Sequence, residues 1–347
     1  MLALTGCNMV VMNPTGDVAV QQRDLILIST GLMLIIIIPV MILTVVFAWR
    51  YRATNTRAKY DPDFDHSMSL ELVVWACPLL IIIALGAVTW SSTHLLDPFR
   101  PLDRIAPGRP VAAGTKPLEV QVVALDWKWL FIYPEQGIAT INELALPVDV
   151  PVHFSITSNT QMNTFYVPTM AGMIYAMPNM QSELHAVLNQ PGESWGQSSN
   201  YTGAGFSYMR FKTVGMDQNG FNGWVQQVKA GEALTAAKYL ELAKPSERVP
   251  AMHFGTVEAG LYDRALNRCV EAGRPCANAT MASDMQRGGG DPRSHVGGGN
   301  PPSHGSMPMP GARPDGALMR EPEEKGTGPN IGSPQGPNGP NQPATNN

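Results

Sequence analysis

The sequence has little charge, and no excess of positive charge. Only 15% of its 347 residues are charged, and 24 Lys and Arg stand against 28 Asp and Glu. Soluble proteins reach about 25% charged residues, and a net charge of −4 argues against a nucleic-acid partner held by a basic patch. The length allows about two domains. Hydrophobic residues nevertheless make up 44%. They are concentrated in two runs, which excludes a soluble cytosolic enzyme.

Two long runs without a charged residue lie near the N-terminus. The first, Leu25–Trp49, has 25 residues and the second, Leu72–Trp90, has 19. As helices they would reach about 37 Å and about 28 Å, which matches a hydrocarbon core of about 30 Å. Pro39 within the first run is tolerated in membrane helices. Buried core helices are shorter and carry more charge, so the runs predict a transmembrane hairpin over residues 25–95.

The basic residues predict the orientation of this hairpin. The connector carries four of them between residues 50 and 59, whereas only Arg23 and Arg100 flank the outer ends. Positive charge stays on the cytoplasmic side of a membrane, so the connector is expected in the cytoplasm. The N-terminus and everything after about residue 91 would then lie outside. We expect a multi-pass protein of a bacterial inner membrane with its C-terminal domain in the periplasm.

Cysteines suggest a lipid anchor and a disulfide. Leu4-Thr5-Gly6-Cys7 fits the motif in which a bacterial lipoprotein is acylated on cysteine, so residues 1–24 are expected to be a signal remnant and a lipid-anchored segment. Only six residues precede Cys7 and none is basic, whereas a secretory signal needs a basic start and an apolar stretch. Either the true start lies upstream or Cys7 is not processed. Cys269 and Cys276 lie in the external part, where disulfides persist, so a disulfide is favoured over metal binding.

Short strands are expected after residue 118. The candidates, several of which alternate apolar and polar residues, are Leu118–Val122, Ala139–Leu146, Val152–Thr157, Glu183–Leu188 and Phe206–Val214. Prolines separate them, and many short strands divided by turn residues are typical of an antiparallel sandwich or barrel. We therefore expect a β-sandwich over residues 118–215, joined to the hairpin by a linker over residues 96–117.

The last third of the chain has a different character. Apolar residues near i, i+3 and i+4 spacing predict a helix over Phe221–Ala243, within a C-terminal helical region over residues 216–287. Residues 288–347 contain 26 Gly or Pro. Such a segment cannot build a core, so we expect a disordered tail. Copper binding in the tail is less favoured than an incidental composition bias, although it holds His295, His304, Met307 and Met309.

Three segments carry a resemblance to a known family. They are Phe47–Arg52 at the end of the first run, Glu71–Trp75 at the start of the second, and the aromatic stretch Asp126–Thr140. With the hairpin and sandwich, they resemble subunit II of the haem–copper respiratory oxidases, and more closely that of the cytochrome bo-type ubiquinol oxidases. The resemblance covers about residues 4–280. It implies that the sandwich is a cupredoxin-like Greek-key domain.

The same resemblance points to a missing metal centre. In the branch of the family that oxidises cytochrome c, an upstream His and the pattern C-x-E-x-C-x-x-x-H-x-x-M hold two copper ions. Thiolates and imidazoles suit copper. Here the corresponding positions hold Asn163, Ser198, Asn200, Thr202 and Phe206, and only Met209 is retained. The resemblance therefore implies a copper-free domain, no metal and no catalytic residue in this chain, and electrons supplied by a membrane quinol.

The resemblance also assigns partners and roles. Haems and copper would belong to a partner subunit I, which also binds ubiquinol; subunits III and IV and membrane phospholipid would complete a proton-pumping complex. Glu71 matches the acidic residue at the mouth of a proton pathway, where a carboxylate at a membrane edge relays protons. Alternatively, it only stabilises a helix N-terminus. Trp127 and Trp129 match an aromatic cluster and are expected to pack near subunit I.

Two other functions remain open at this stage. One is a membrane-anchored periplasmic protein with a cupredoxin-like domain that binds or handles copper outside the respiratory chain. The other is a subunit of a cytochrome c oxidase, which the missing copper ligands disfavour. Purification with a haem-bearing partner would separate the first from an oxidase subunit, and an absorbance band of dinuclear copper would identify the second.

Overall fold

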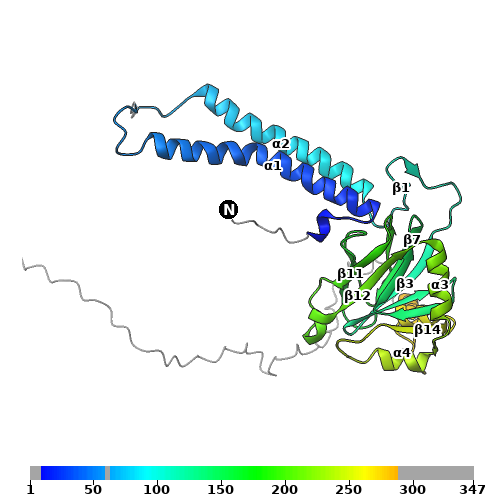
Figure 1. Ribbon diagram of the computed structural model, residues 1–347. Helices are drawn as coiled ribbons and strands as arrows, with labels where there is room; N and C mark the ends of the chain where they lie inside the picture. The colour runs from blue at the N-terminus through cyan, green and yellow to red at the C-terminus, as the bar shows by residue number, and fades with distance from the viewer. Residues whose placement is uncertain (1–8, 59–62, 288–347) are drawn as a thin grey trace, which may run out of the picture. The chain divides into compact units, whose positions relative to one another are not determined.

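The computed structural model describes residues 9–58 and 63–287. After a short 3-10 turn, η1 (Val10–Met12), it begins with two long helices, α1 (Asp17–Arg50) and α2 (Met68–Leu95), which lie side by side (Figure 1). Both are long and apolar enough to cross a membrane. They extend the predicted runs at both ends, because polar residues that flank an apolar segment can continue its helix. Most of their side chains are exposed in this chain alone, as expected for surfaces that contact lipid or another protein, while Asp17, Val18 and Ala19 at the start of α1 are buried.

Two sheets form a sandwich, and two short strands form a separate hairpin. The seven-stranded sheet has the order β10-β7-β3-β4-β5-β14-β13, and the five-stranded sheet has the order β6-β12-β11-β8-β9. The members of the first are β3 (Leu118–Leu125), β4 (Lys128–Tyr133), β5 (Ile138–Ile141), β7 (Pro151–Ser158), β10 (Ser182–Val187), β13 (Glu232–Leu234) and β14 (Met252–Val257). The second contains β6 (Glu143–Pro147), β8 (Asn163–Tyr166), β9 (Ile174–Ala176), β11 (Gly192–Ser198) and β12 (Arg210–Met216), while β1 (Arg104–Ala106) pairs with β2 (Arg109–Pro110).

The sheets are mixed rather than purely antiparallel, which corrects the prediction. β3 pairs with β7 in parallel, and β6 pairs with β12 in parallel. The cause lies at Asn142, where the single predicted strand Ala139–Leu146 divides into β5 and β6 and the chain crosses from one sheet to the other. Strands joined by a hairpin pair antiparallel. When the chain crosses to the other sheet, its next strand can pair with a strand far away in the sequence, and such a pair can be parallel.

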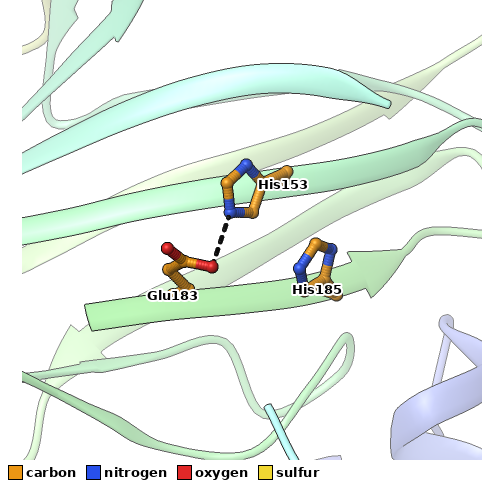
Figure 2. A group of neighbouring side chains, drawn as sticks. All are labelled: His153, Glu183 and His185. Atoms are coloured by element: carbon orange, nitrogen blue, oxygen red, sulfur yellow. Dashed lines mark ion pairs between the residues drawn. The ribbon is translucent and has the colours of Figure 1, made fainter. Parts of the chain in front are cut away.

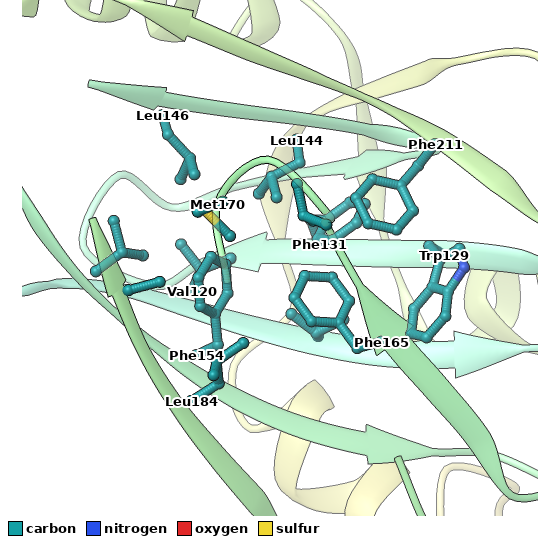
Figure 3. Close-up of a cluster of buried hydrophobic side chains, with 14 of the residues drawn as sticks. Val120, Trp129, Phe131, Leu144, Leu146, Phe154, Phe165, Met170, Leu184 and Phe211 are labelled. Carbon is teal, nitrogen blue, oxygen red and sulfur yellow. The ribbon is translucent and has the colours of Figure 1, made fainter. Parts of the chain in front are cut away.

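The core between the sheets is rich in aromatic side chains (Figure 3). Phe165 and Phe211 stack with ring centroids 5.4 Å apart, and Phe131 packs edge-on against Phe211 at 5.0 Å. Tyr133 links the two sheets, because its hydroxyl donates to the carbonyl of Ala145 and accepts from the amide of the same residue, both at 3.0 Å. Burial raises the pKa of the Tyr133 hydroxyl, so it stays protonated for this role.

A second core covers the outer face of the seven-stranded sheet. It contains Leu130, Ile132, Tyr239, Phe254 and Tyr262, all buried. Every residue of β4 is consequently buried, since the strand has an apolar layer on each side. The C-terminal region is therefore part of the extramembrane fold, to which it contributes two strands as well as helices.

The single helix predicted over Phe221–Ala243 is wrong in detail. The structure has α3 (Gln218–Val228), then β13, then α4 (Ala236–Leu242), with α5 (Leu261–Leu266) and α6 (Ala277–Arg287) further on. The break falls at Gly231, where an added β-carbon would lie 2.5 Å from the backbone oxygen of His253. Glycine there lets β13 approach β14, and it also disfavours a continuous helix by about 1 kcal/mol.

Glu258 ties α4 to the end of β14 and makes the stability of this region pH-dependent. Its carboxylate accepts a hydrogen bond from the amide of Ala236 at 2.6 Å and pairs with Arg264 at 2.7 Å. These bonds, the first above all, lower the pKa of Glu258. The folded chain therefore takes up the proton less readily than the unfolded chain. The stabilisation is complete above the ordinary carboxyl pKa and is lost as the pH falls through the lowered value.

Glu258→Gln is accordingly expected to unfold more easily than the parent at neutral pH, with the difference vanishing in acid. Thermal unfolding of the detergent-solubilised full chain across a pH series measures this. Glu241→Gln is the control, since Glu241 is an exposed carboxylate of α4 whose partner within residues 9–58 and 63–287 is Lys238. A gap between Glu258→Gln and the parent that persists unchanged in acid would contradict the assignment.

Candidate functional site

The positions that the sequence matches to the family's copper ligands come together at one end of the five-stranded sheet. Asn163 opens β8 and Ser198 closes the neighbouring strand β11, where Ser198 lies opposite Phe165. The loop after β11 carries Asn200 and Thr202. It continues through the short helix η2 (Ala204–Tyr208), which contains Phe206, to Met209 just before β12. The predicted strand Phe206–Val214 thus starts later, at Arg210. The resemblance to the family's copper-binding pattern grouped these residues, and the fold places them at one end of the same sheet.

Hydrogen bonds engage the polar side chains of Asn163, Ser198 and Asn200, whereas the buried hydroxyl of Thr202 has no partner among the described residues. The hydroxyl of Ser198 donates to the side-chain oxygen of Asn163 at 3.3 Å and accepts from the amide of Thr164 at 3.4 Å. The side-chain amide of Asn163 donates to the carbonyl of Gln161 at 3.0 Å, and that of Asn200 donates to the carbonyl of Met162 at 2.8 Å. The amides and the hydroxyl therefore fasten the two loops to each other.

Met209 is the one sulfur-bearing residue among these positions. Its side chain is 1% exposed and belongs to the core, and its backbone carbonyl accepts from the amide of Ser198 at 3.2 Å. Phe206 packs edge-on against Tyr201 with ring centroids 5.6 Å apart. The six positions offer amides, hydroxyls, a phenyl ring and one thioether, with no thiolate and no imidazole.

Trp127 holds the loop that carries several of these positions. It turns the chain between β3 and β4 with a φ of 64°, and its indole N–H donates to the carbonyl of Thr202 at 2.9 Å. A β-carbon at Gly205 would lie 2.4 Å from the indole ring. Glycine at that position is therefore needed for the half-buried ring to lie flat against the loop.

Trp129 has a different place from the one expected. Its side chain is 0% exposed and lies inside the core, with ring centroids 5.5 Å from Phe165 and 5.7 Å from Phe211 (Figure 3). A fully buried side chain cannot contact another subunit, so the expected packing of Trp129 near subunit I is wrong. Of the two tryptophans, only Trp127 has an exposed part.

Glu71 lies in the first turn of α2 and has a partner that sequence reasoning missed. The Nδ1 atom of His66 is 2.7 Å from the Glu71 carboxylate, and the two side chains are 58% and 48% exposed. The pair sits at the end of the connector that precedes the helix. Separation along the sequence does not predict this contact, because His66 precedes the helix and its direction depends on the loop.

The cysteine predictions fall in different parts of the chain. Cys269 and Cys276 form a disulfide that joins the segment after α5 to the start of α6. Cys7 lies outside the described residues, as does the tail over residues 288–347 with its histidines and methionines.

Two family models agree with the class of fold. The family model "Cytochrome C oxidase subunit II, periplasmic domain" matches residues 120–214, and the model "COX Aromatic Rich Motif" matches residues 229–273. Among solved structures, the periplasmic domain of subunit II of cytochrome oxidase from Bradyrhizobium japonicum is similar at 21% identity and a TM-score of 0.32. The similar region covers 35% of this chain and 96% of the solved domain.

Curated relatives narrow the class. Cytochrome bo(3) ubiquinol oxidase subunit 2 of Pseudomonas aeruginosa is 50% identical over 77% of this chain and 78% of its own length. The protein of the same name from Pseudomonas putida is 47% identical over 82% and 89%, and ubiquinol oxidase subunit 2 of Acetobacter aceti is 47% identical over 76% and 83%. The chain belongs to the subunit 2 family of the cytochrome bo-type ubiquinol oxidases. It is a membrane-anchored protein with a periplasmic domain.

Proposed function

We propose that this chain is a non-catalytic subunit, without a dinuclear copper centre, of a proton-pumping quinol oxidase that oxidises ubiquinol and reduces oxygen to water. The observation that carries the proposal is the set of six side chains at the positions of the family's copper ligands. A dinuclear copper centre needs bridging thiolates and imidazoles, and none of these residues supplies either. Asn163, Ser198 and Asn200 make hydrogen bonds that fasten two loops, and the buried hydroxyl of Thr202 has no hydrogen-bond partner among the described residues.

The electron route follows from this donor set. Without copper in the periplasmic domain, electrons from cytochrome c have no acceptor in this chain, so a membrane quinol is the donor. The relatives named as ubiquinol oxidase subunits support this choice. Haems and copper belong to subunit I, which also binds the quinol, and subunits III and IV and phospholipid complete the complex.

The place of the chain in the cell is part of the proposal. Helices α1 and α2 span the bacterial inner membrane, the connector lies in the cytoplasm, and the sandwich lies in the periplasm. Basic residues in the connector and apolar, exposed helix surfaces support this orientation. Cys7 would add a lipid anchor. The chain would then brace subunit I through its hairpin and cover it with the sandwich.

A single purification tests the function. The complex is isolated in mild detergent and assayed with ubiquinol and with reduced cytochrome c as alternative donors, and its copper content per haem is measured. Turnover with quinol alone, together with a haem-bearing partner of many spans, is the expected result. Isolation without such a partner would favour the copper-handling alternative. Turnover with cytochrome c, or copper beyond that of subunit I, would contradict a copper-free subunit.

Glu71 is proposed as the point where protons enter from the cytoplasm. A carboxylate at a membrane edge can pass protons between water and an internal chain, and His66 beside it is a second titratable group. Glu71→Gln cannot carry a proton and is expected to lower quinol turnover severalfold while the assembled complex is recovered in normal yield. Oxygen consumption per haem measures this effect.

The control for Glu71→Gln removes a negative charge nearby without altering Glu71, the proposed point of proton entry. Asp65→Asn removes one carboxylate from the same connector, close to His66. It is expected to leave turnover unchanged. If Glu71→Gln is as active as Asp65→Asn and the parent, Glu71 only stabilises the N-terminus of its helix, to which an acidic residue contributes about 0.3–1 kcal/mol.

A further inference from the structure

Four titratable side chains form a row across one edge of the seven-stranded sheet. His185 on the edge strand β10 lies opposite His153 on β7, and His153 lies opposite Glu119 on β3. Glu183 precedes His185 by two residues in β10 and therefore points to the same face. The alternate residues Val120, Phe154 and Leu184 are in the core, so the row lies on the outer face of the sheet.

The donor atoms of three of these side chains converge (Figure 2). One ligand atom each from His153, Glu183 and His185 lies within 4.8 Å of the others. The Nε2 atom of His153 is 3.4 Å from Glu183 and is buried without a hydrogen bond among the described residues. Ligands of tetrahedral zinc, with bonds of about 2.0–2.1 Å, stand about 3.4 Å apart. The separation of His153 from Glu183 already equals this value.

The remaining histidine needs only a rotation of its ring. The imidazoles of His153 and His185 are stacked, with centroids 4.5 Å apart and an interplanar angle of 15°. The lone pairs of an imidazole lie in its ring plane, so two stacked, nearly parallel rings do not both point at one ion, and His185 must turn about its side-chain bonds to share an ion with His153. Burial and the neighbouring His153 lower the pKa of His185.

Glu119 supplies the orientation that metal-binding histidines usually have. Its carboxylate lies 2.8 Å from the Nδ1 atom of His153. This contact places the proton on Nδ1 and leaves the Nε2 lone pair free for a ligand. Carboxylate–histidine–zinc arrangements of this kind raise the basicity of the ligand and fix its ring.

We propose that His153, Glu183 and His185 bind one zinc ion, with Glu119 as the orienting partner of His153. Two imidazoles and a carboxylate form a known zinc donor set, and the fourth position stays open for water. The site is distinct from the six positions discussed above, which lie on the other sheet. Bound zinc would fasten the edge strand β10 to β7. It would also steady the segment after α2, since the amide of His185 donates to the carbonyl of Pro98 at 3.0 Å.

Zinc titration of the purified complex tests the site. The detergent-solubilised complex is stripped with a chelator, and bound zinc per chain is measured by equilibrium dialysis at neutral pH. We expect one saturable site in the micromolar range or tighter. Glu183→Gln and His185→Asn should each weaken it by at least about 100-fold, and Glu119→Gln by about 10–100-fold, as outer partners of metal ligands do.

A matched histidine on the same sheet provides the control. His253 on β14 pairs with Glu143 far along the sheet from β10, and His253→Asn should leave zinc affinity unchanged. Zinc should also raise the thermal midpoint of the parent and of His253→Asn, but not that of His185→Asn. The proposal is overturned if the parent binds no more zinc than His185→Asn. In that case, a protonated His153 that bridges Glu119 and Glu183 accounts for the row. Because binding is measured without turnover, the result is independent of the oxidase assignment.

Discussion

Replacing Trp129 by alanine is expected to lower the free energy of unfolding of the extramembrane fold by about 3–5 kcal/mol. The indole is fully buried between Phe165 and Phe211, so its removal leaves a cavity in the centre of the aromatic core. Collapse cannot fill this cavity easily. Gly196 lies opposite Phe211, and a β-carbon there would be 2.0 Å from the phenyl ring, so the neighbouring backbone already touches the core.

Urea unfolding of the detergent-solubilised full chain, followed by circular dichroism, measures this loss. Trp195→Ala is the matched control, because Trp195 lies on β11 with 63% of its surface exposed. That variant should stay within about 0.5 kcal/mol of the parent. Trp129→Phe should cost clearly less than the alanine variant, since the indole N–H of Trp129 has no hydrogen-bond partner among the described residues. Equal losses in Trp129→Ala and Trp195→Ala would refute the core assignment.

The hairpin could be predicted from the sequence because a membrane helix is recognised from a local property, the length of a run without charged residues. Length without charge is sufficient to identify a membrane helix, whatever the rest of the chain does. β3 and β7 were also accessible, since Leu118–Val122 and Val152–Thr157 alternate apolar and polar residues. β4 has no such alternation. Both of its faces are buried, one by the sandwich core and one by the C-terminal region, and this depends on contacts with residues more than a hundred positions away.

The candidate site was partly accessible for the same kind of reason. The resemblance to the family's copper-binding pattern grouped Ser198, Asn200 and Met209 before their positions in the fold were known. An aromatic run, by contrast, does not tell which of its side chains faces the core. Trp127 and Trp129 are two residues apart, yet one lies in a turn at positive φ and the other is the second residue of the buried strand β4. The row of His153 and His185 depends on strand register, which no local pattern in the chain encodes.

The crossing between the two sheets gives the second large effect. Asn142 has a φ of 55°, in the left-handed region, and is 9% exposed. Its side-chain oxygen accepts from the amide of Trp129 at 2.9 Å, and its side-chain amide donates to the carbonyl of Val249 at 2.8 Å. The backbone amide of Asn142 donates to the carbonyl of Trp129, and its backbone carbonyl accepts from the amide of Lys212, both at 2.9 Å. One residue therefore joins β4, β12 and the segment before β14.

Asn142→Ala should lower the free energy of unfolding by about 2–5 kcal/mol. The loss combines about 1–3 kcal/mol for leaving buried partners unpaired with about 1–2 kcal/mol for forcing alanine into a left-handed conformation. Asn142→Gly removes the same two bonds but tolerates the backbone, so it should recover about 1 kcal/mol. Urea unfolding of the two variants separates the contributions. If glycine proves no more stable than alanine, backbone conformation is not what favours asparagine at this crossing, and the hydrogen bonds to Trp129 and Val249 account for the whole effect.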